Sequence, residues 1–350
     1  MNSLRIGVLG GGQLGRMMAL AAYPLGLKLE FMDPNPQAPV APLAALTIDK
    51  LEDKKAISLF SQGFDIITTE IEHISVEGLK AAEAAGVVVE PKPQTFEIIQ
   101  DKLKQKEFLQ NSDIPTPEFC GIDGLEHLKS VARDWGFPLI LKSRLSAYDG
   151  KGNALIADTK ELEPAYKELA QKGGGLYLEK VVPFTKEVAV MVARTRSGAI
   201  DCYPAVETIQ EDNICKETRF FGEEPWSKAA KDIATEAIAK LEGAGVFGVE
   251  LFLTESGELL LNEIAPRPHN SGHYTIEACH TSQFEQHVRA IAGLPLGSCA
   301  PKVPAAVMYN ILGKIEGSAG HDHIKKLRKA ALATPAAHFH WYGKDALKKQ

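Results

Sequence analysis

The first ninety residues alternate short apolar runs with helical segments, and this alternation constrains the fold more than any other feature of the chain. Helical patterns near residues 13–25, 52–62 and 75–85 separate the apolar runs Leu4–Leu9, Leu27–Met32, Phe64–Thr69 and Val87–Val89. Parallel strands need long crossover connections, which are usually helices. The pattern therefore predicts an α/β unit with a doubly wound parallel sheet over residues 1–94.

The pattern of predicted helices and strands changes beyond residue 94. A polar helix is predicted for about residues 94–111, and the proline-rich stretch Ile114–Pro117 marks a junction because proline cannot continue a helix. Two hairpins follow, with Ser197-Gly198 and Ser256-Gly257 in their turns. The strands expected for them are Val188–Thr195 with Ala199–Val206 and Val246–Thr254 with Glu258–Ile264.

Helices near residues 124–135, 159–171, 227–242 and 282–292 complete an α+β region over 95–295. Residues 296–350 are predicted to form a small third domain, with a strand at Ala305–Leu312 and a basic helix around Ile324–Ala331.

Charge and composition exclude several classes of protein. The chain has 45 acidic and 39 basic side chains, a net charge of −6, which disfavours a nucleic-acid partner. No apolar run approaches the ~18 residues of a membrane span, and no signal peptide precedes the first strand, so we expect a cytoplasmic protein without a membrane partner. The scattered cysteines show neither zinc-ribbon nor disulfide spacing and are expected to be small buried hydrophobic residues: Cys120, Cys202, Cys215, Cys279 and Cys299.

The turn Gly10–Gly15 satisfies G-x-G-x-x-G between a strand and a helix, and Asp33 ends the second strand. This combination has three interpretations: a dinucleotide site, a purely structural tight turn, or a site for an anion or substrate phosphate. Nothing downstream supplies a hydride-transfer site. We therefore favour the anion site.

Two carboxylates, Glu70 and Glu72, follow the strand Phe64–Thr69 at the sheet edge where doubly wound folds bind ligands. If that strand continues, both side chains point the same way and could orient an amine or a hydroxyl-rich ligand. The alternative is an acidic helix N-terminus.

A lysine, Lys142, ends the apolar strand 138–142, and a small basic loop over 143–153 follows it. Because a buried ammonium needs an anionic partner, we predict a phosphate contact there. A solvated loop tip is the alternative.

The late hairpin carries Glu250 and the pair Asn262-Glu263 inside otherwise apolar strands. Burying such carboxylates is costly unless they bind a cation, and oxygen ligands favour Mg²⁺ on nucleotide phosphates over zinc. Carboxylates on an exposed sheet edge are the alternative.

A guanidinium and an imidazole, from Arg267 and His269, stand directly after this hairpin and could hold an anionic intermediate. For His269 the alternative is a ring that only satisfies a backbone carbonyl. The remaining histidines of the C-terminal region have no acidic partner at metal spacing and are interpreted as surface or structural residues: His321, His323, His338 and His340.

Several of these motifs, taken together, resemble the N5-carboxyaminoimidazole ribonucleotide synthase family of ATP-grasp enzymes over nearly the whole chain. The segments that carry the resemblance are Gly10–Met17, Glu70–His73, Gln100–Lys102, Tyr148–Gly152, Glu207-Thr208 with Asn213–Cys215, Asn262–His273 and Tyr342–Lys344. The resemblance implies an ATP-grasp fold. Its Rossmann-like pre-ATP-grasp domain would span 1–94, its ATP-grasp domain 95–295 with a lid at about 115–182, and its small C-terminal domain 296–350.

The resemblance also implies a role for each matching residue. The ATP side would comprise Lys102, Lys142, Asp149, Gly150, Lys151, Gly152, Asn153, Glu179, Lys180, Val182, Glu187 and Asn262, with Glu187 on the ribose and Glu250 and Glu263 on Mg²⁺. Arg267 and His269 would hold carboxyphosphate, and Tyr148 and Glu72 would lie near the aminoimidazole ribonucleotide. Further substrate contacts would be Gly12, Gln13, Leu14, Glu70, Asn270, Ser271 and Lys344.

The implied reaction is the carboxylation of 5-aminoimidazole ribonucleotide in de novo purine synthesis, driven by ATP and bicarbonate and releasing ADP and phosphate. The implied cofactors are ATP and Mg²⁺, with Mn²⁺ as an alternative, and the implied partners are a second copy of the chain and the carboxyaminoimidazole ribonucleotide mutase. A formate-dependent glycinamide ribonucleotide transformylase, an NAD-dependent dehydrogenase and a nucleotide-binding regulatory module are the competing interpretations.

The sequence departs from the family pattern at two places. Gln210 stands near the position of a nucleotide-contacting histidine in some members, so that contact is unassigned. The family usually continues past the position of Gln350 with a basic tail, so the third domain is expected to be incomplete.

Overall fold

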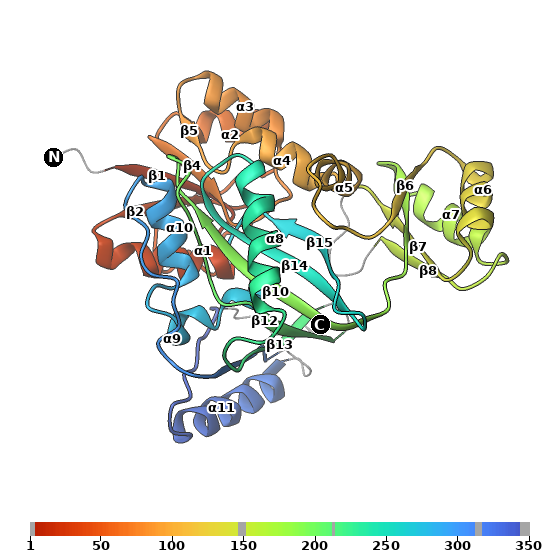
Figure 1. Ribbon diagram of the computed structural model, residues 1–350. Helices are drawn as coiled ribbons and strands as arrows, with labels where there is room; N and C mark the ends of the chain where they lie inside the picture. The colour runs from red at the N-terminus through yellow and green to blue at the C-terminus, as the bar shows by residue number, and fades with distance from the viewer. Residues whose placement is uncertain (1–3, 146–151, 212–213, 312–316, 344–350) are drawn as a thin grey trace.

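The computed structural model describes residues 4–145, 152–211, 214–311 and 317–343, which form three sheets (Figure 1). The N-terminal sheet is entirely parallel, with strand order β3-β2-β1-β4-β5. Its strands are β1 Arg5–Leu9, β2 Lys28–Met32, β3 Leu46–Thr47, β4 Ile66–Thr69 and β5 Val88–Val89, and its helices are α1 Gln13–Ala22, α2 Lys54–Ser61 and α3 Val76–Ala84, with a 3₁₀ turn at Tyr23–Leu25. The predicted doubly wound unit is confirmed, with the short strand β3 added.

The single polar helix predicted for residues 94–111 is wrong, because the segment forms two helices, α4 Pro93–Gln100 and α5 Lys102–Asn111. The break lies at Asp101, whose backbone is extended and whose side chain accepts hydrogen bonds from the amides of Leu103 and Lys104. An aspartate in this position caps a new helix more favourably than it continues an old one.

A small antiparallel sheet with order β6-β9-β7-β8 projects to one side of the molecule in Figure 1. Two helices pack on it and enclose a separate apolar core that includes Leu128, Leu141 and Leu178. The elements are β6 Phe119–Ile122, α6 Leu125–Trp135, β7 Leu139–Ser143, β8 Asn153–Ile156, α7 Leu162–Ala170 and β9 Leu176–Lys180. We call this unit the lid sheet.

The largest sheet has strand order β15-β14-β10-β12-β13-β16, and β11 also pairs with β10. Alternate residues of β10 face opposite cores: Val190 packs toward the helix α8, whereas Met191 packs toward Tyr274 and Cys279. The elements are β10 Phe184–Arg194, β11 Ile200–Cys202, β12 Val206–Glu211, β13 Ile214–Phe220, α8 Ser227–Lys240, β14 Gly245–Thr254, β15 Leu259–Ala265 and β16 Ala306–Tyr309. The late hairpin is confirmed, but the predicted strand Ala199–Val206 is split into β11 and β12, which pair with different parts of β10.

The helix α10, Gln283–Ile291, joins the parallel sheet to the large sheet. Its apolar residues Phe284 and Val288 belong to the core of the parallel sheet. The buried His287 ring contacts Thr68 Oγ1 at 2.9 Å through Nε2 and accepts a hydrogen bond from the Val246 amide at 3.1 Å through Nδ1. One imidazole therefore connects β4 to β14.

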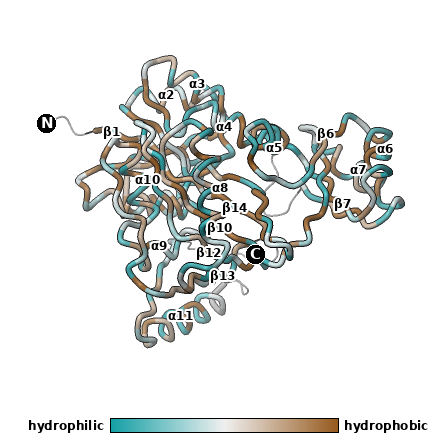
Figure 2. Tube along the Cα trace, viewed as in Figure 1, coloured by the Kyte–Doolittle hydropathy of each residue, from teal (hydrophilic) through white to brown (hydrophobic). Residues whose placement is uncertain are grey.

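The C-terminal part continues from β16 into the helix α11, Gly317–Ala333, which lies at the bottom of Figure 1. The short elements η2 Asn270–Gly272 and α9 Thr275–Ala278 precede α10. In Figure 2 the trace of α5 is largely hydrophilic, in keeping with its lysines, whereas that of α11 mixes hydrophilic and hydrophobic residues. Within the described ranges, no helix is both long and apolar enough to cross a membrane.

Candidate functional site

A cavity of about 1670 Å³ lies where the parallel sheet, the large sheet and the C-terminal segment meet. Most of the predicted site residues line it: Gly12, Gln13, Leu14, Glu70, Glu72, Lys102, Asn153, Glu187, Glu250, Asn262, Glu263, Arg267, His269 and Asn270. Gln210, whose contact was unassigned, lines it as well. Tyr148, Asp149, Gly150, Lys151 and Lys344 lie outside the described residues. The tertiary structure thus gathers residues from all three predicted domains around one space.

Three amides of the glycine-rich turn donate to carboxylates of the chain itself. The amides of Gly12 and Gly15 donate to the two carboxylate oxygens of Glu70, and the Gly11 amide donates to Asp33 Oδ2 at 2.8 Å. A Cβ atom on Gly12 would lie 2.5 Å from Glu70 Oε1, so glycine is required for this contact. These contacts argue against the dinucleotide site, because the chain's own carboxylates occupy part of the helix N-terminus. Gly12, Gln13 and Leu14 line the cavity, and a substrate or anion contact there stays a prediction.

The two carboxylates that follow β4 have different partners, because the strand does not continue through them as a common direction would require. The strand ends at Thr69; Glu70 turns to the glycine-rich turn, where burial raises its pKa. Glu72 instead accepts from Arg267 Nε at 2.5 Å and Nη2 at 3.0 Å. Burial alone raises the pKa of Glu72, but the paired guanidinium outweighs it and lowers the pKa to about 2. This ion pair connects the parallel sheet to the loop after β15.

The carboxylates of Glu250 and Glu263 lie directly opposite each other on β14 and β15, at a register irregularity. Lys102 Nζ lies 2.9 Å from Glu263 Oε2 and lowers the pKa of that carboxyl. Among the described residues Glu250 has no such lysine partner, and burial together with the charges of Glu263 and Glu187 raises its pKa. Like charges across a strand pair are unfavourable without a cation. Both side chains line the cavity. The Glu250 side chain is 22% exposed on the inner strand β14, so the exposed-edge interpretation is not supported for it, whereas Glu263 is 41% exposed on the edge strand β15.

These donors fit a hard cation that shares its coordination with a substrate. In the described part of the chain, no group of three or more His, Cys, Asp and Glu side chains could hold a metal by itself. Two carboxylates and the amide oxygen of Asn262 instead supply the partial oxygen set that Mg²⁺ takes when phosphate oxygens complete its shell.

The imidazole of His269 is fixed by its neighbours. Its Nδ1 lies 2.8 Å from Ser271 Oγ and accepts weakly from the Ser271 amide at 3.4 Å, so the ring proton is placed on Nε2, 3.7 Å from Glu250 Oε1. Burial and the nearby Arg267 lower the pKa of His269 to about 4. Ser271 therefore positions His269 and does not itself line the cavity.

A glutamine that the sequence did not single out, Gln283, also holds this segment. Its Oε1 accepts from the His269 amide at 3.0 Å, and its Nε2 donates to the His269 carbonyl at 2.8 Å. Gln283 stands ten residues after His273, the last residue of the preceding motif, so spacing could not have identified it.

The ammonium of Lys142 already has an anionic partner within the protein. It contacts Glu179 on β9, and Lys106 Nζ lies 3.1 Å from the other oxygen of the same carboxylate. The argument that Lys142 needs a phosphate as its counterion is therefore wrong, although a phosphate contact stays a prediction. Lys106 was missed, although its i+4 spacing from Lys102 places both lysines on one face of α5.

Of the other residues predicted to contact the nucleotide, some line the cavity and some do not. Glu187 lines the cavity with its carboxylate hydrogen-bonded to Gln210, which accounts for the side chain at that unassigned position. Lys180 pairs with Glu118 at 2.7 Å and lies over the Trp135 ring. Lys142, Gly152, Glu179, Lys180 and Val182 do not line the cavity.

Two histidines interpreted as having no acidic partner do have one. His338 Nδ1 and His340 Nε2 lie 3.6 and 3.2 Å from Glu277 Oε1, and all three residues line the cavity. The partner was missed because it stands 63 residues from His340 in the sequence. The C-terminal segment is thereby held against the cavity wall.

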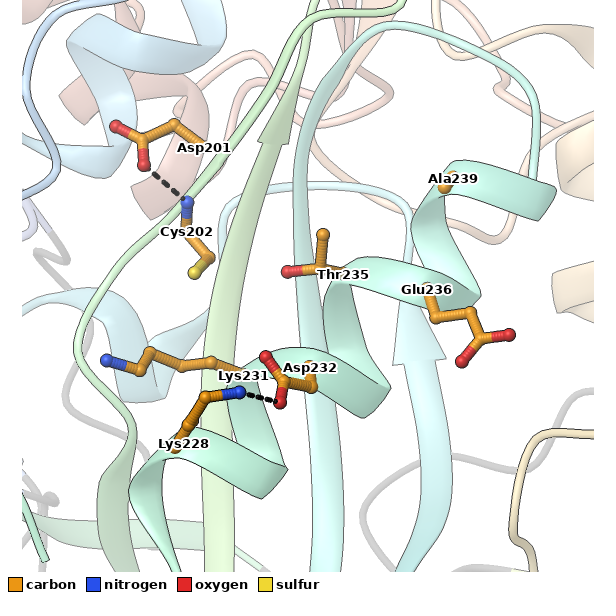
Figure 3. A pocket seen from close by; sticks show the side chains of 8 residues that line it. All are labelled: Asp201, Cys202, Lys228, Lys231, Asp232, Thr235, Glu236 and Ala239. Carbon is orange, nitrogen blue, oxygen red and sulfur yellow. Dashed lines mark hydrogen bonds and ion pairs between the residues drawn. The ribbon is translucent and has the colours of Figure 1, made fainter.

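A second pocket, of about 600 Å³, lies between β11 and α8 (Figure 3). Its charged side chains are paired within the protein, with Lys228 2.6 Å from Asp232 and Lys231 2.7 Å from Glu223. None of the predicted site residues within the described ranges lines this pocket.

Family models match three parts of the chain: an ATP-grasp domain over residues 107–284, a ribonucleotide synthetase preATP-grasp domain over 3–100, and a phosphoribosylaminoimidazole carboxylase C-terminal domain over 306–350. The chain is 46% identical to the chloroplastic phosphoribosylaminoimidazole carboxylase of Vigna aconitifolia, covering 99% of this chain and 62% of that protein. It thus spans less than two thirds of that relative.

Two further proteins are similar over most of their own length. The N5-carboxyaminoimidazole ribonucleotide synthase of Synechococcus elongatus is 40% identical, with 98% of this chain and 86% of that protein covered. A crystal structure of the N5-carboxyaminoimidazole synthase of Aspergillus clavatus, in complex with ADP and 5-aminoimidazole ribonucleotide, has a TM-score of 0.88 and 36% identity, covering 99% of this chain and 91% of that one.

Proposed function

This chain belongs to the N5-carboxyaminoimidazole ribonucleotide synthase family of ATP-grasp enzymes, and from that premise we propose that it carboxylates 5-aminoimidazole ribonucleotide with ATP and bicarbonate. One observation carries the proposal beyond the family resemblance. A single cavity brings the facing carboxylates of Glu250 and Glu263 next to Lys102 on one side and the Arg267–Glu72 ion pair on the other. This arrangement supports the proposal of a centre that activates the phosphate beside a centre that holds an anion.

The first half of the reaction transfers a phosphoryl group from ATP to bicarbonate. In the proposal, Lys102 and Lys142 neutralise the phosphates, and Glu250, Glu263 and Asn262 hold Mg²⁺, which supplies charge neutralisation when bound. Phosphoryl transfer depends mainly on positioning and on electrostatic stabilisation, and this set of side chains supplies both.

The second half uses the carboxyphosphate formed in the first. Arg267 would bind it through the guanidinium edge that Glu72 leaves free, and the Nε2 proton of His269 would donate to it. Because the pKa of His269 is lowered to about 4, the ring is neutral at pH 7 and donates without adding a charge. Glu72 and Tyr148 would then face the aminoimidazole ribonucleotide. Its exocyclic amine attacks the carboxyl carbon, the C–O bond to the phosphate breaks as the N–C bond forms, and the departing phosphate takes up the proton of the amine.

The finer assignments belong to the same proposal. We place the enzyme in the cytoplasm, as a homodimer that supplies its product to the carboxyaminoimidazole ribonucleotide mutase. The five free cysteines support a reducing compartment. Mn²⁺ is the alternative to Mg²⁺.

Phosphate release from MgATP tests the reaction and separates the alternatives. We expect release with bicarbonate to be strongly stimulated by 5-aminoimidazole ribonucleotide and not by glycinamide ribonucleotide with formate. Stimulation by the latter pair would assign the formate-dependent transformylase instead. MgATP binding without phosphate release in either mixture would favour the regulatory module, and thermal protection by NADH but not by MgATP would favour the dehydrogenase.

A further inference from the structure

Three charged side chains form a buried group between α5 and the lid sheet. Glu179 on β9 contacts Lys142 of β7 with one carboxylate oxygen and lies 3.1 Å from Lys106 of α5 with the other. The side chains of Glu179 and Lys106 are each 3% exposed, whereas that of Lys142 is 13% exposed. One buried carboxylate is therefore shared by two ammonium groups.

The two lysines are not held equally. Lys106 Nζ also donates to Thr116 Oγ1 at 3.1 Å, and that hydroxyl donates to the Leu261 carbonyl of β15 at 2.9 Å. For Lys142 the only side-chain partner described is Glu179. Lys106 is thus anchored to the large sheet, and Lys142 is the ammonium that can leave the carboxylate.

Departure of Lys142 has an electrostatic consequence that depends on Lys106. A buried carboxylate left without a counterion is strongly destabilised, so it would hold back a lysine that is its only partner. With Lys106 in place, Glu179 keeps one counterion whether or not Lys142 remains. Burial lowers the pKa of Lys106 to about 8, and the charge of Glu179 opposes that effect, so the ammonium form persists at neutral pH.

We propose that Lys106 is a positioning residue that neutralises Glu179 and thereby frees Lys142 to bind the phosphates of the nucleotide. The inference rests on the proposed function, because it takes Lys142 as a phosphate ligand. Lys106 itself touches no substrate; it acts through Glu179.

The test is a double-mutant cycle on the equilibrium dissociation constant for MgATP, measured with the full chain by calorimetry. We expect Lys106→Met to weaken MgATP binding about tenfold, within the range of coupling found for contacting charged residues. In the Glu179→Gln background the same substitution should have almost no effect, because no carboxylate is left to retain Lys142. Lys106→Arg keeps the charge and should bind MgATP nearly as the unchanged chain does.

The controls separate this role from a merely structural one. Lys104→Met, on the exposed side of the same helix, should leave the dissociation constant unchanged. The Lys106→Met/Glu179→Gln variant removes both charges together, so it stays informative even if Lys106→Met alone unfolds, which thermal unfolding will reveal.

Two results would overturn the inference but not the proposed function. The first is that Lys106→Met weakens MgATP binding equally in the unchanged chain and in Glu179→Gln. The second is that the soluble double variant binds MgATP much more weakly than Glu179→Gln does. Failure of the unchanged chain to bind MgATP would instead overturn the proposed function, and the inference with it.

Discussion

Glu263 is the residue whose charge the proposed reaction uses most directly. Glu263→Gln keeps the volume of the side chain but removes one anionic ligand for Mg²⁺ and the partner of Lys102. We expect kcat for phosphate release to fall by at least ~10²-fold at saturating Mg²⁺, while the fold persists. Glu255→Gln, in the exposed turn of the same hairpin, is the matched control and should be neutral. Near-normal turnover in Glu263→Gln would reject the metal assignment.

Arg267 is expected to serve the intermediate more than the nucleotide. Its proposed ligand exists only after the first phosphoryl transfer, so Arg267→Ala should lower kcat by about 10²-fold or more and leave the dissociation constant for MgATP within about twofold. Steady-state kinetics and calorimetry on the same preparation measure both. If Arg267→Ala abolishes MgATP binding but spares turnover at high ATP, then Arg267 is a nucleotide contact.

The ion pair between Glu72 and Arg267 makes the free energy of unfolding depend on pH. The pKa of Glu72 is about 2 in the folded protein and about 4.5 when unpaired, so its contribution is fully present above pH 4.5 and is lost as the pH falls toward 2. The shift corresponds to about 3 kcal/mol. The difference in free energy of unfolding between the unchanged chain and Glu72→Gln should therefore shrink between pH 5 and pH 2.5 in urea titrations. A difference that does not change with pH would show that the guanidinium does not hold the pKa of Glu72 down.

At the scale of elements, the turn into α1 is built around the side chain of Glu70. Gly12→Ala would place a Cβ atom 2.5 Å from Glu70 Oε1, which must move and leave the amides of Gly12 and Gly15 without their acceptor. We expect a loss of about 1–3 kcal/mol in the free energy of unfolding, measured by urea denaturation. Gly124→Ala, at an extended position with no atom within 4 Å of the new Cβ, is the control. Equal effects of the two substitutions would contradict this account of the turn.

The helix predicted for residues 94–111 is interrupted because one polar side chain, that of Asp101, changes the backbone conformation. Asp101 divides the predicted helix because it caps α5 while pairing with Arg144 through Oδ1 at 3.1 Å and Oδ2 at 2.6 Å. Apolar periodicity carries no signal for such a break. The capping preference of aspartate does carry such a signal.

At the scale of the whole molecule, His287 connects the parallel sheet to the large sheet. His287→Leu would leave Thr68 Oγ1 and the Val246 amide without their buried partner, at a cost of about 2–5 kcal/mol at pH 7. Burial lowers the pKa of His287 to about 3, so the unfolded chain binds the extra proton between about pH 6.5 and pH 3. As the pH decreases through that window, the free energy of unfolding of the unchanged chain should therefore decrease more steeply than that of His287→Leu. Calorimetry at a series of pH values measures both. Parallel pH profiles would contradict a neutral buried imidazole.

Much of the architecture was already specified along the chain. The alternation in the first ninety residues predicted the parallel sheet, and the turns at Ser197-Gly198 and Ser256-Gly257 predicted hairpins, because both signals arise from residues close in sequence. The motifs likewise identified some of the residues that line the cavity and the ATP-grasp fold that the family comparisons confirm.

Only the tertiary structure decided which charges neutralise one another. Glu70 reaches the turn 58 residues before it, Arg267 pairs with a carboxylate 195 residues away, and Lys142 meets Glu179 at a separation of 37. Periodicity reports which side of an element is buried, whereas an ion pair depends on how distant elements pack. A lysine at the end of a buried strand therefore predicts that some anion lies nearby, and the packing of β7 against β9 determines that this anion is Glu179.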